Sequence, residues 1–182
     1  AIEINPSYAI THNNLGLVYK SLLELQKAKI CYEKAIEIDS NFVDAHNNLG
    51  VVLKRLGELQ KAKSSFEKAI EINPSAAVVH NNLGVVFEEL GELQKAKSCT
   101  EKAIEINPNY VDAYWNLHSF TSDIDEALTI LKKTYEIDNK YIRAKIMISA
   151  LQGFKGNFNE FDALIASSDS NHPYMRSIKW IF

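Results

Sequence analysis

The motif H-N-N-L-G occurs three times in this chain, at residues 12–16, 46–50 and 80–84. The copies are 34 residues apart, and the likeness extends well beyond them, because residues 45–74 and 79–108 agree at 24 of 30 positions. A fixed period of this length is typical of proteins built from stacked repeats, in which each unit buries its apolar face only against its neighbours. The period therefore predicts an array that presents an extended surface, without a closed pocket for chemistry.

Each repeat is predicted to form two helices. In the second copy, apolar residues follow helical spacing over residues 45–53, and Gly57 then ends the helix in a turn that tolerates positive φ. A second periodic run covers residues 59–72, and Pro74 ends it because the residue before a proline is disfavoured in the α conformation. The unit is therefore a helix–turn–helix hairpin.

The pattern of large and small residues in these units resembles the tetratricopeptide repeat. That family carries Leu-Gly at the seventh and eighth positions, a large residue at the eleventh, and then alanine, an aromatic residue, alanine and proline. The matching residues are Leu15, Gly16, Tyr19, Ala28, Tyr32 and Ala35 in unit 9–42, with Ser40 in place of proline; Leu49, Gly50, Leu53, Ala62, Phe66, Ala69 and Pro74 in unit 43–76; and Leu83, Gly84, Phe87, Ala96, Ala103 and Pro108 in unit 77–110. In the third unit Thr100 replaces the aromatic residue, so we expect local repacking or a weaker joint there.

The remaining sequence fits the same frame less well. Residues 111–141 form a shortened unit, residues 142–170 a degenerate one that keeps Gly156, and residues 171–182 a capping helix. Residues 1–8 match the tail of a preceding repeat, and the chain ends on an apolar triplet, so we expect a fragment of a longer protein. The resemblance thus implies one all-α domain, a right-handed α-solenoid of about five antiparallel helix pairs with a C-terminal capping helix.

Composition and motifs exclude several classes of function. The net charge of −3 does not favour nucleic acid or an anionic membrane as a partner, and no apolar run is long enough to span a bilayer. No phosphate loop, zinc-protease motif or nucleophile elbow is present, so we expect no catalysis and no cofactor. The histidines His12, His46 and His80 are one repeat apart, too far to share a metal ion, and we interpret them as core residues. The two cysteines, Cys31 and Cys99, are interpreted as buried or half-buried thiols of a cytoplasmic protein.

The resemblance implies that the first helices line the concave face of the array. On that face the sixth position of each unit is an asparagine, and an amide can pair with a peptide backbone whatever the peptide's side chains. Such a row is similar to the asparagine ladder in the repeats of O-linked N-acetylglucosamine transferase, which holds extended peptides. The alternative is that these residues cross-link neighbouring helices without any ligand. They are Asn14, Asn48, Asn82 and Asn116.

Two further groups on the same face are candidates for ligand contact. The fifth position holds an asparagine in three units and then Trp115, which either anchors a partner or packs against the shortened unit. Charge changes sign along the array, which either orients a partner of mixed charge or is simply solvated. The members are Asn13, Asn47 and Asn81 at the fifth position, the cations Lys20, Lys54 and Arg55, and the anions Glu88, Glu89 and Asp123.

We therefore expect a protein-interaction scaffold that binds an extended peptide or a helix in its groove. The alternative is the substrate-recruiting arm of a larger enzyme, because similar repeats occur upstream of glycosyltransferases and bacterial methyltransferases. Weak self-association through apolar ends of the array is a third possibility.

Overall fold

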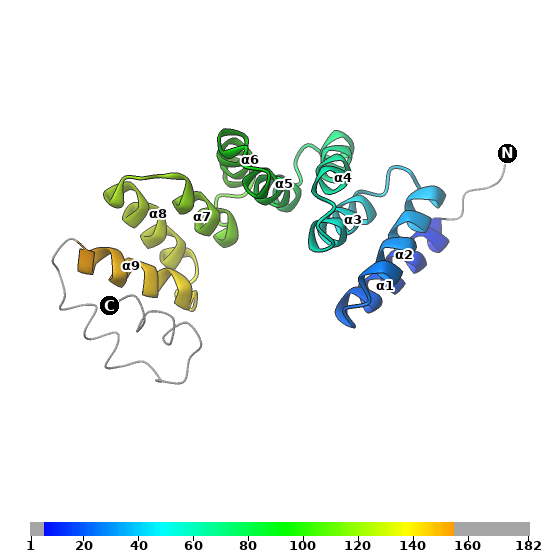
Figure 1. The fold of residues 1–182 in the computed structure, drawn as a ribbon, viewed down its shortest axis with the longest axis horizontal. Helices are drawn as coiled ribbons and strands as arrows, with labels where there is room; N and C mark the ends of the chain where they lie inside the picture. Colours follow the sequence, from blue (N-terminus) through cyan, green and yellow to red (C-terminus); the bar gives the residue numbers. More distant parts are fainter. Residues whose placement is uncertain (1–5, 155–182) are drawn as a thin grey trace. The chain divides into compact units, whose positions relative to one another are not determined.

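The computed structural model describes residues 6–154, and every regular element in them is helical (Figure 1). By their internal contacts the described residues fall into two compact units, divided between Ala113 and Tyr114, which are treated separately below. The elements are α1 (Pro6–Ser21), α2 (Leu25–Ile38), α3 (Val43–Arg55), α4 (Leu59–Ile72), α5 (Ala77–Glu89), α6 (Leu93–Ile106), α7 (Val111–Leu117), the 3-10 helix η1 (His118–Phe120), α8 (Ile124–Ile137) and α9 (Ile142–Phe154). This confirms the predicted all-α architecture.

The first unit is built from three helix pairs, α1 with α2, α3 with α4, and α5 with α6. Each pair also packs on the next, because α2 contacts α3 and α4 contacts α5. Among the first helices, α1 contacts α3 and α3 contacts α5. The second copy of the repeat folds as its pattern predicts, with one helix ending at Arg55 before Gly57 and the other at Ile72 before Asn73-Pro74.

The turn between the two helices of a pair has the same backbone in all three copies. Gly57 and Gly91 adopt φ values of 76° and 77°, the left-handed region that favours glycine. The first copy holds Leu23 at this position, and its φ is 62°. Because a side chain costs about 1–2 kcal/mol in this conformation, the first repeat carries local strain that the other two avoid.

In each helix pair of the first unit, a residue of the second helix packs over a glycine of the first helix. The fully buried rings of Tyr32 and Phe66 cover Gly16 and Gly50, and a Cβ atom on Gly50 would lie 2.7 Å from the Phe66 ring. In the third pair Thr100 takes the place of the ring and is also fully buried. Its hydroxyl donates to the Ala96 carbonyl at 3.0 Å, so the buried polar atom is satisfied within its own helix. The predicted repacking or weaker joint at residue 100 stays a prediction.

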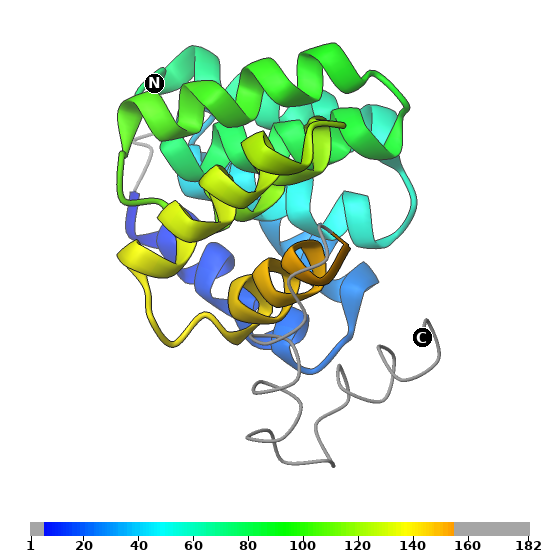
Figure 2. The ribbon, with the colours of Figure 1, turned by 90° about the vertical axis from the view of Figure 1, so that its left-hand side faces the viewer.

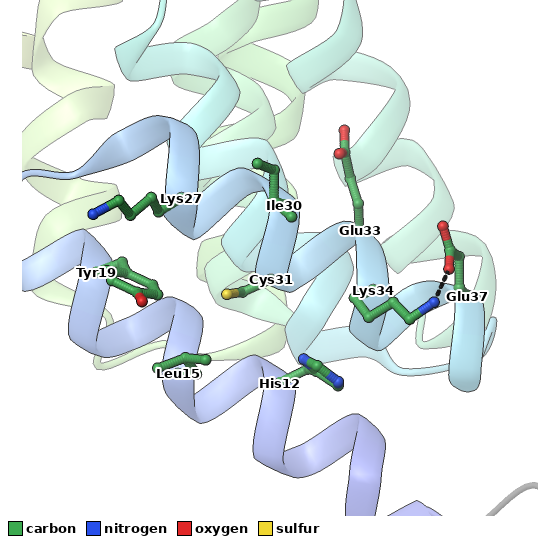
Figure 3. A pocket seen from close by; sticks show the side chains of 9 residues that line it. All are labelled: His12, Leu15, Tyr19, Lys27, Ile30, Cys31, Glu33, Lys34 and Glu37. Atoms are coloured by element: carbon green, nitrogen blue, oxygen red, sulfur yellow. Dashed lines mark hydrogen bonds and ion pairs between the residues drawn. The ribbon is translucent and has the colours of Figure 1, made fainter.

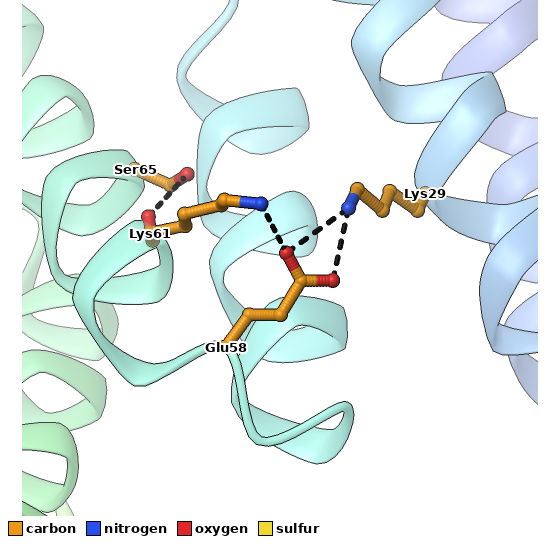
Figure 4. A network of polar contacts seen from close by, with 4 residues as sticks. All are labelled: Lys29, Glu58, Lys61 and Ser65. Atoms are coloured by element: carbon orange, nitrogen blue, oxygen red, sulfur yellow. Dashed lines mark hydrogen bonds and ion pairs between the residues drawn. The ribbon is translucent and has the colours of Figure 1, made fainter.

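Neighbouring repeats are also joined by charges at the start of the second helix. The Glu58 carboxylate, just before α4, accepts hydrogen bonds from Lys61 Nζ at 2.6 Å and from Lys29 Nζ of α2 at 2.9 Å (Figure 4). In the same view the Ser65 hydroxyl donates to the Lys61 carbonyl. The bonds from Lys61 and Lys29 lower the pKa of Glu58.

The second unit departs from the repeat where its sequence does. The helix α7 ends after seven residues at Leu117, and η1 follows it. No glycine is present at the next turn; instead Asp123 caps α8, accepting from the Asp125 and Glu126 amides at 2.8 and 2.9 Å. The helices α8 and α9 pack side by side (Figure 2). The expectations for residues 1–5, for the Gly156 turn and for the capping helix 171–182 fall outside the described residues.

Candidate functional site

The sixth-position asparagines of the first unit lie on the surface formed by α1, α3 and α5, here called the first-helix face. Asn14 is exposed, and Asn48 and Asn82 are half-buried. The face forms because equivalent positions of three directly contacting helices project to the same side. The structure therefore brings these three predicted residues into one row.

The asparagines also link the first helices to one another. Asn48 Nδ2 donates to Asn13 Oδ1 at 3.0 Å, and Asn82 Nδ2 donates to Asn47 Oδ1 at 2.9 Å. The sixth-position amide of one repeat is thus bonded to the fifth-position amide of the repeat before it. Each bond uses one of the two N–H donors of the sixth-position amide. The other N–H and the oxygen of that amide can bind a second partner.

The fifth-position residues lie deeper than the sixth-position ones. Asn13 and Asn81 are only 5% and 4% exposed, and Asn47 is half-buried. Burial, with the charge of Asp112, raises the pKa of Tyr110, whereas its hydrogen bond with Asn81 acts in the opposite direction. At this depth the fifth-position amides serve as links between helices, and their access to a ligand is small.

A row of aliphatic side chains runs beside the asparagines. Leu17, Val51 and Val85 each follow an asparagine of the row by three residues, so they share its helix face. Leu17 is 38% exposed, and the two valines are half-buried. Sequence reasoning did not single them out, although the same 34-residue spacing marks them. Together the two rows offer amides and apolar contacts at every repeat.

The charges at the ends of the first helices are partly paired with one another. Lys54 Nζ of α3 lies 3.3 Å from Glu89 Oε1 of α5. One cation and one anion of the predicted charge gradient therefore form an ion pair with each other. Burial and then the nearby Arg55 charge lower the pKa of Lys20. Arg55 and Glu88 are exposed. A positive region at α1 and α3 and a negative side chain on α5 therefore face solvent.

The family model of the tetratricopeptide repeat matches residues 9–42, 43–76 and 77–110, more than half of the chain and in the frame found above. The chain is a tetratricopeptide repeat protein. No curated protein sequence matches it.

Many solved structures resemble this tetratricopeptide repeat protein. MamA is 26% identical, with 80% of this chain and 86% of MamA covered and a TM-score of 0.68. YrrB, described as a TPR protein with an unusual peptide-binding site, is 25% identical, with 98% and 95% covered and a TM-score of 0.67. The pilF protein of Pseudomonas aeruginosa is 21% identical, with 91% and 78% covered and a TM-score of 0.80, a likeness of fold alone.

In the second unit the predicted residues sit in a local aromatic cluster. The half-buried Trp115 ring lies 4.6 Å from the His118 ring and 5.7 Å from the Tyr141 ring. His118 Nδ1 also donates to the Trp115 carbonyl. Asn116 is half-buried, and Asp123 is engaged as the cap of α8. These contacts pack Trp115 within the shortened repeat, and its predicted role as an anchor for a partner stays a prediction.

Two of the three repeat histidines, His46 and His80, each make a structural hydrogen bond. His46 Nε2 donates to the Ser40 carbonyl and His80 Nε2 to the Pro74 carbonyl, each at 2.9 Å, so each ring ties a first helix to the loop before it. His46 is buried, as predicted, whereas His12 and His80 are half-exposed, so the interpretation as core residues is wrong for those two. Over residues 6–154 no histidines, cysteines or carboxylates cluster as metal ligands would, and no helix there is long and apolar enough to cross a bilayer. Burial raises the pKa of both thiols, Cys31 and Cys99, so neither is activated as a nucleophile.

Proposed function

We propose that this tetratricopeptide repeat protein is a scaffold that binds an extended segment of another protein along its first-helix face. The observation that carries the proposal is the pair of parallel rows, one of asparagines and one of aliphatic residues, repeated once per helix pair. The rows are Asn14, Asn48 and Asn82, and Leu17, Val51 and Val85.

The spacing of the rows suits an extended chain. Adjacent packed helices are about 8–10 Å apart, and an extended peptide advances about 3.3 Å per residue. One asparagine therefore meets the peptide at about every third residue. An amide carries both donor and acceptor groups, so it pairs with the peptide backbone independently of sequence, while the aliphatic row contacts the peptide's side chains.

The charges favour one direction for the bound segment. Lys20 and Arg55 form a positive region beside α1 and α3, and Glu88 lies at the end of α5. Because Lys54 and Glu89 bind each other, the charge available to a ligand is concentrated at the two ends of the row. A segment with acidic residues at one end and a basic residue at the other complements this arrangement.

The likeness to YrrB supports a peptide ligand, since that protein is described as having a peptide-binding site and is similar over almost the whole chain. The family supports the broader role, because tetratricopeptide repeats generally serve as interaction scaffolds without catalysis.

The test is a binding screen against a library of extended peptides, measured by fluorescence anisotropy. The triple variant Asn14→Ala, Asn48→Ala, Asn82→Ala is expected to weaken binding at least about tenfold. Its matched control is Gln26→Ala, Gln60→Ala, Gln94→Ala, which removes three exposed amides with the same spacing from the second helices. The control is expected to bind as the wild type does.

Two of the asparagines also hold helices together, so a second variant separates binding from stability. Val51→Lys adds charge to the aliphatic row and leaves the Asn13–Asn48 and Asn47–Asn82 bonds in place. It is expected to weaken binding without changing the urea midpoint by more than a small amount. Binding that survives both the triple variant and Val51→Lys would overturn the proposal.

A further inference from the structure

The joint between α3 and α5 shows how side chains of neighbouring first helices pair along the first-helix face. Asn82 Nδ2 donates to Asn47 Oδ1, and seven residues later on both helices Lys54 Nζ lies 3.3 Å from Glu89 Oε1. Seven residues are about two helical turns, so the same sides of α3 and α5 face each other at both contacts. The second contact neutralises one cation with one anion.

The joint between α1 and α3 has the same register but different charges. Asn48 Nδ2 donates to Asn13 Oδ1, which is the counterpart of the asparagine contact in the next joint. Seven residues later on both helices are Lys20 and Arg55, so two cations occupy the positions of the lysine and the glutamate. Burial and then the charge of Arg55 lower the pKa of Lys20, as expected of two cations that lie near each other. This joint therefore holds two like charges where the next joint holds an ion pair.

Most other cations of the first unit already have a carboxylate partner. For example, Lys34 Nζ lies 2.7 Å from Glu37 Oε2 at the edge of a groove of about 410 Å³ on the first helix pair (Figure 3). Over residues 6–113, the cations that form no ion pair with a described carboxylate are Lys20, Arg55 and Lys97. Because Lys97 belongs to the second helix α6, Lys20 and Arg55 are the two of these cations that share the first-helix face.

A carboxylate is the group that fits this pair of cations. Lys20 is half-buried and Arg55 is exposed, so a ligand on the face has access to both charges. A guanidinium binds a carboxylate through two parallel hydrogen bonds, and an ammonium adds a further charge-assisted donor. A carboxylate between the two cations offsets their repulsion, just as Glu89 neutralises Lys54 at the next joint.

The pair of cations lies close to the path of a segment bound along the first-helix face. Lys20 follows Leu17 of the aliphatic row by three residues, and Arg55 follows Val51 by four, so each shares the helix face of that row. At about 1.5 Å per residue, the two charges lie about 5 Å from the row along the helix axes. That is roughly the length of an extended glutamate side chain. An acidic residue of a segment on the row therefore reaches both cations.

We propose that Lys20 and Arg55 form a binding site for one aspartate or glutamate side chain of the bound segment, at the joint between α1 and α3. The inference rests on the proposed function and adds the position at which the face selects an acidic residue. The joint between α3 and α5 makes no such selection, because Lys54 and Glu89 neutralise each other there. The segment thus carries an acidic residue over α1 and α3 and, about three residues away, an uncharged residue over α3 and α5.

The experiment compares two fluorescent peptide libraries that differ at one position, which is Glu in one library and Gln in the other, with uncharged residues elsewhere. Peptides of about nine residues cross the three first helices, and each position is tested in turn against the full chain by anisotropy. At one position the glutamate library is expected to bind about tenfold more tightly than the glutamine library, and added salt is expected to reduce this preference.

The asparagine variant separates this site from the proposed function. Equal binding of the two libraries at every position, with binding still lost in the Asn14, Asn48, Asn82 triple variant, would overturn the acidic-residue site and leave the proposed function in place. Binding by neither library would overturn both.

Two charge exchanges between the matched joints sharpen the test. Arg55→Glu gives the first joint the charges of the second, and it is expected to abolish the preference for glutamate while the glutamine library still binds. Glu89→Arg gives the second joint the charges of the first, and it is expected to add a second preferred position about three residues from the first. The matched control, Lys97→Gln, removes a cation from α6 and is expected to keep the wild-type preference. A preference that survives Arg55→Glu, or one that Lys97→Gln also abolishes, would overturn the proposal.

Discussion

The first and second repeats carry nearly the same side chains at matched positions, yet they bury them differently. Leu15 and Val18 are 41% and 52% exposed, whereas Leu49 and Val52 are 9% and 0% exposed. The difference arises because α2 covers the second repeat and no described helix covers the first. A repeat of this kind specifies its fold locally but completes its core only with a neighbour. The same side chains therefore lie in a packed joint in the second repeat and are largely exposed in the first.

The largest predicted difference is between the matched leucines. Leu49→Ala is expected to lower the free energy of unfolding by about 2–5 kcal/mol, because it empties space within a packed joint. Leu15→Ala is expected to lower it by about 1 kcal/mol or less, because Leu15 is already 41% exposed to water and its truncation leaves no enclosed cavity. Urea unfolding of the two variants measures both values, and equal losses would break the comparison.

The next largest change in stability is expected at Tyr32 and Phe66, the aromatic residues that pack over a glycine in the first two helix pairs. No described residue makes a hydrogen bond with the fully buried Tyr32 hydroxyl, and burial raises its pKa to about 12. Tyr32→Phe is therefore expected to stabilise the chain by about 1 kcal/mol, and Phe66→Tyr to destabilise it by about 1–3 kcal/mol. Thermal and urea unfolding measure whether each variant is more or less stable than the wild type. A loss of stability in Tyr32→Phe would show that the Tyr32 hydroxyl makes a hydrogen bond.

The turns provide a third matched pair. Leu23→Gly is expected to stabilise the first repeat by about 1 kcal/mol, because glycine adopts the φ of 62° without strain. Gly57→Leu is expected to cost a similar amount, since nothing lies within 4 Å of its Cβ position and only the backbone is strained. The urea midpoints of the two variants should move in opposite directions, and movement in the same direction would contradict a shared turn.

The smallest effect concerns the asparagine links, which are the same in both repeats. Double-mutant cycles for Asn13 with Asn48 and for Asn47 with Asn82 are each expected to give a coupling of about 0.5–1.5 kcal/mol. The control cycle combines Asn47→Ala with Asn48→Ala, which break the Asn47–Asn82 and Asn13–Asn48 bonds respectively. Since Asn47 and Asn48 belong to different links, no coupling is expected between them. A coupling in one cycle only would show that the two joints differ.

Much of this fold follows from the sequence because the residues that end the helices of each repeat act locally. Gly57 and Pro74 set helix ends that the structure reproduces within two residues. The left-handed Leu23 is different, because a leucine gives no local signal for positive φ. Only its alignment with Gly57 and Gly91 indicates the turn, and there the neighbouring repeats outweigh the residue's own preference.

The sequence predicted that asparagines recur once per repeat on the first helices, but not which of them are buried and which are exposed. Asn13 and Asn14 are adjacent and chemically identical, so only the rotation of α1 against α3 decides that Asn13 is buried and Asn14 exposed. The links Asn13–Asn48, Asn47–Asn82 and Lys54–Glu89 each span 35 residues, one repeat plus one. That offset reflects the stagger of neighbouring first helices, and a search at the 34-residue period alone does not find it.

Hydrogen exchange of the backbone amides tests most directly whether the cover that α2 gives the second repeat makes it more stable than the first. In the free chain the amides of α1 and α2 are expected to exchange faster than those of α3 and α4. Equal protection of the two helix pairs would contradict the account.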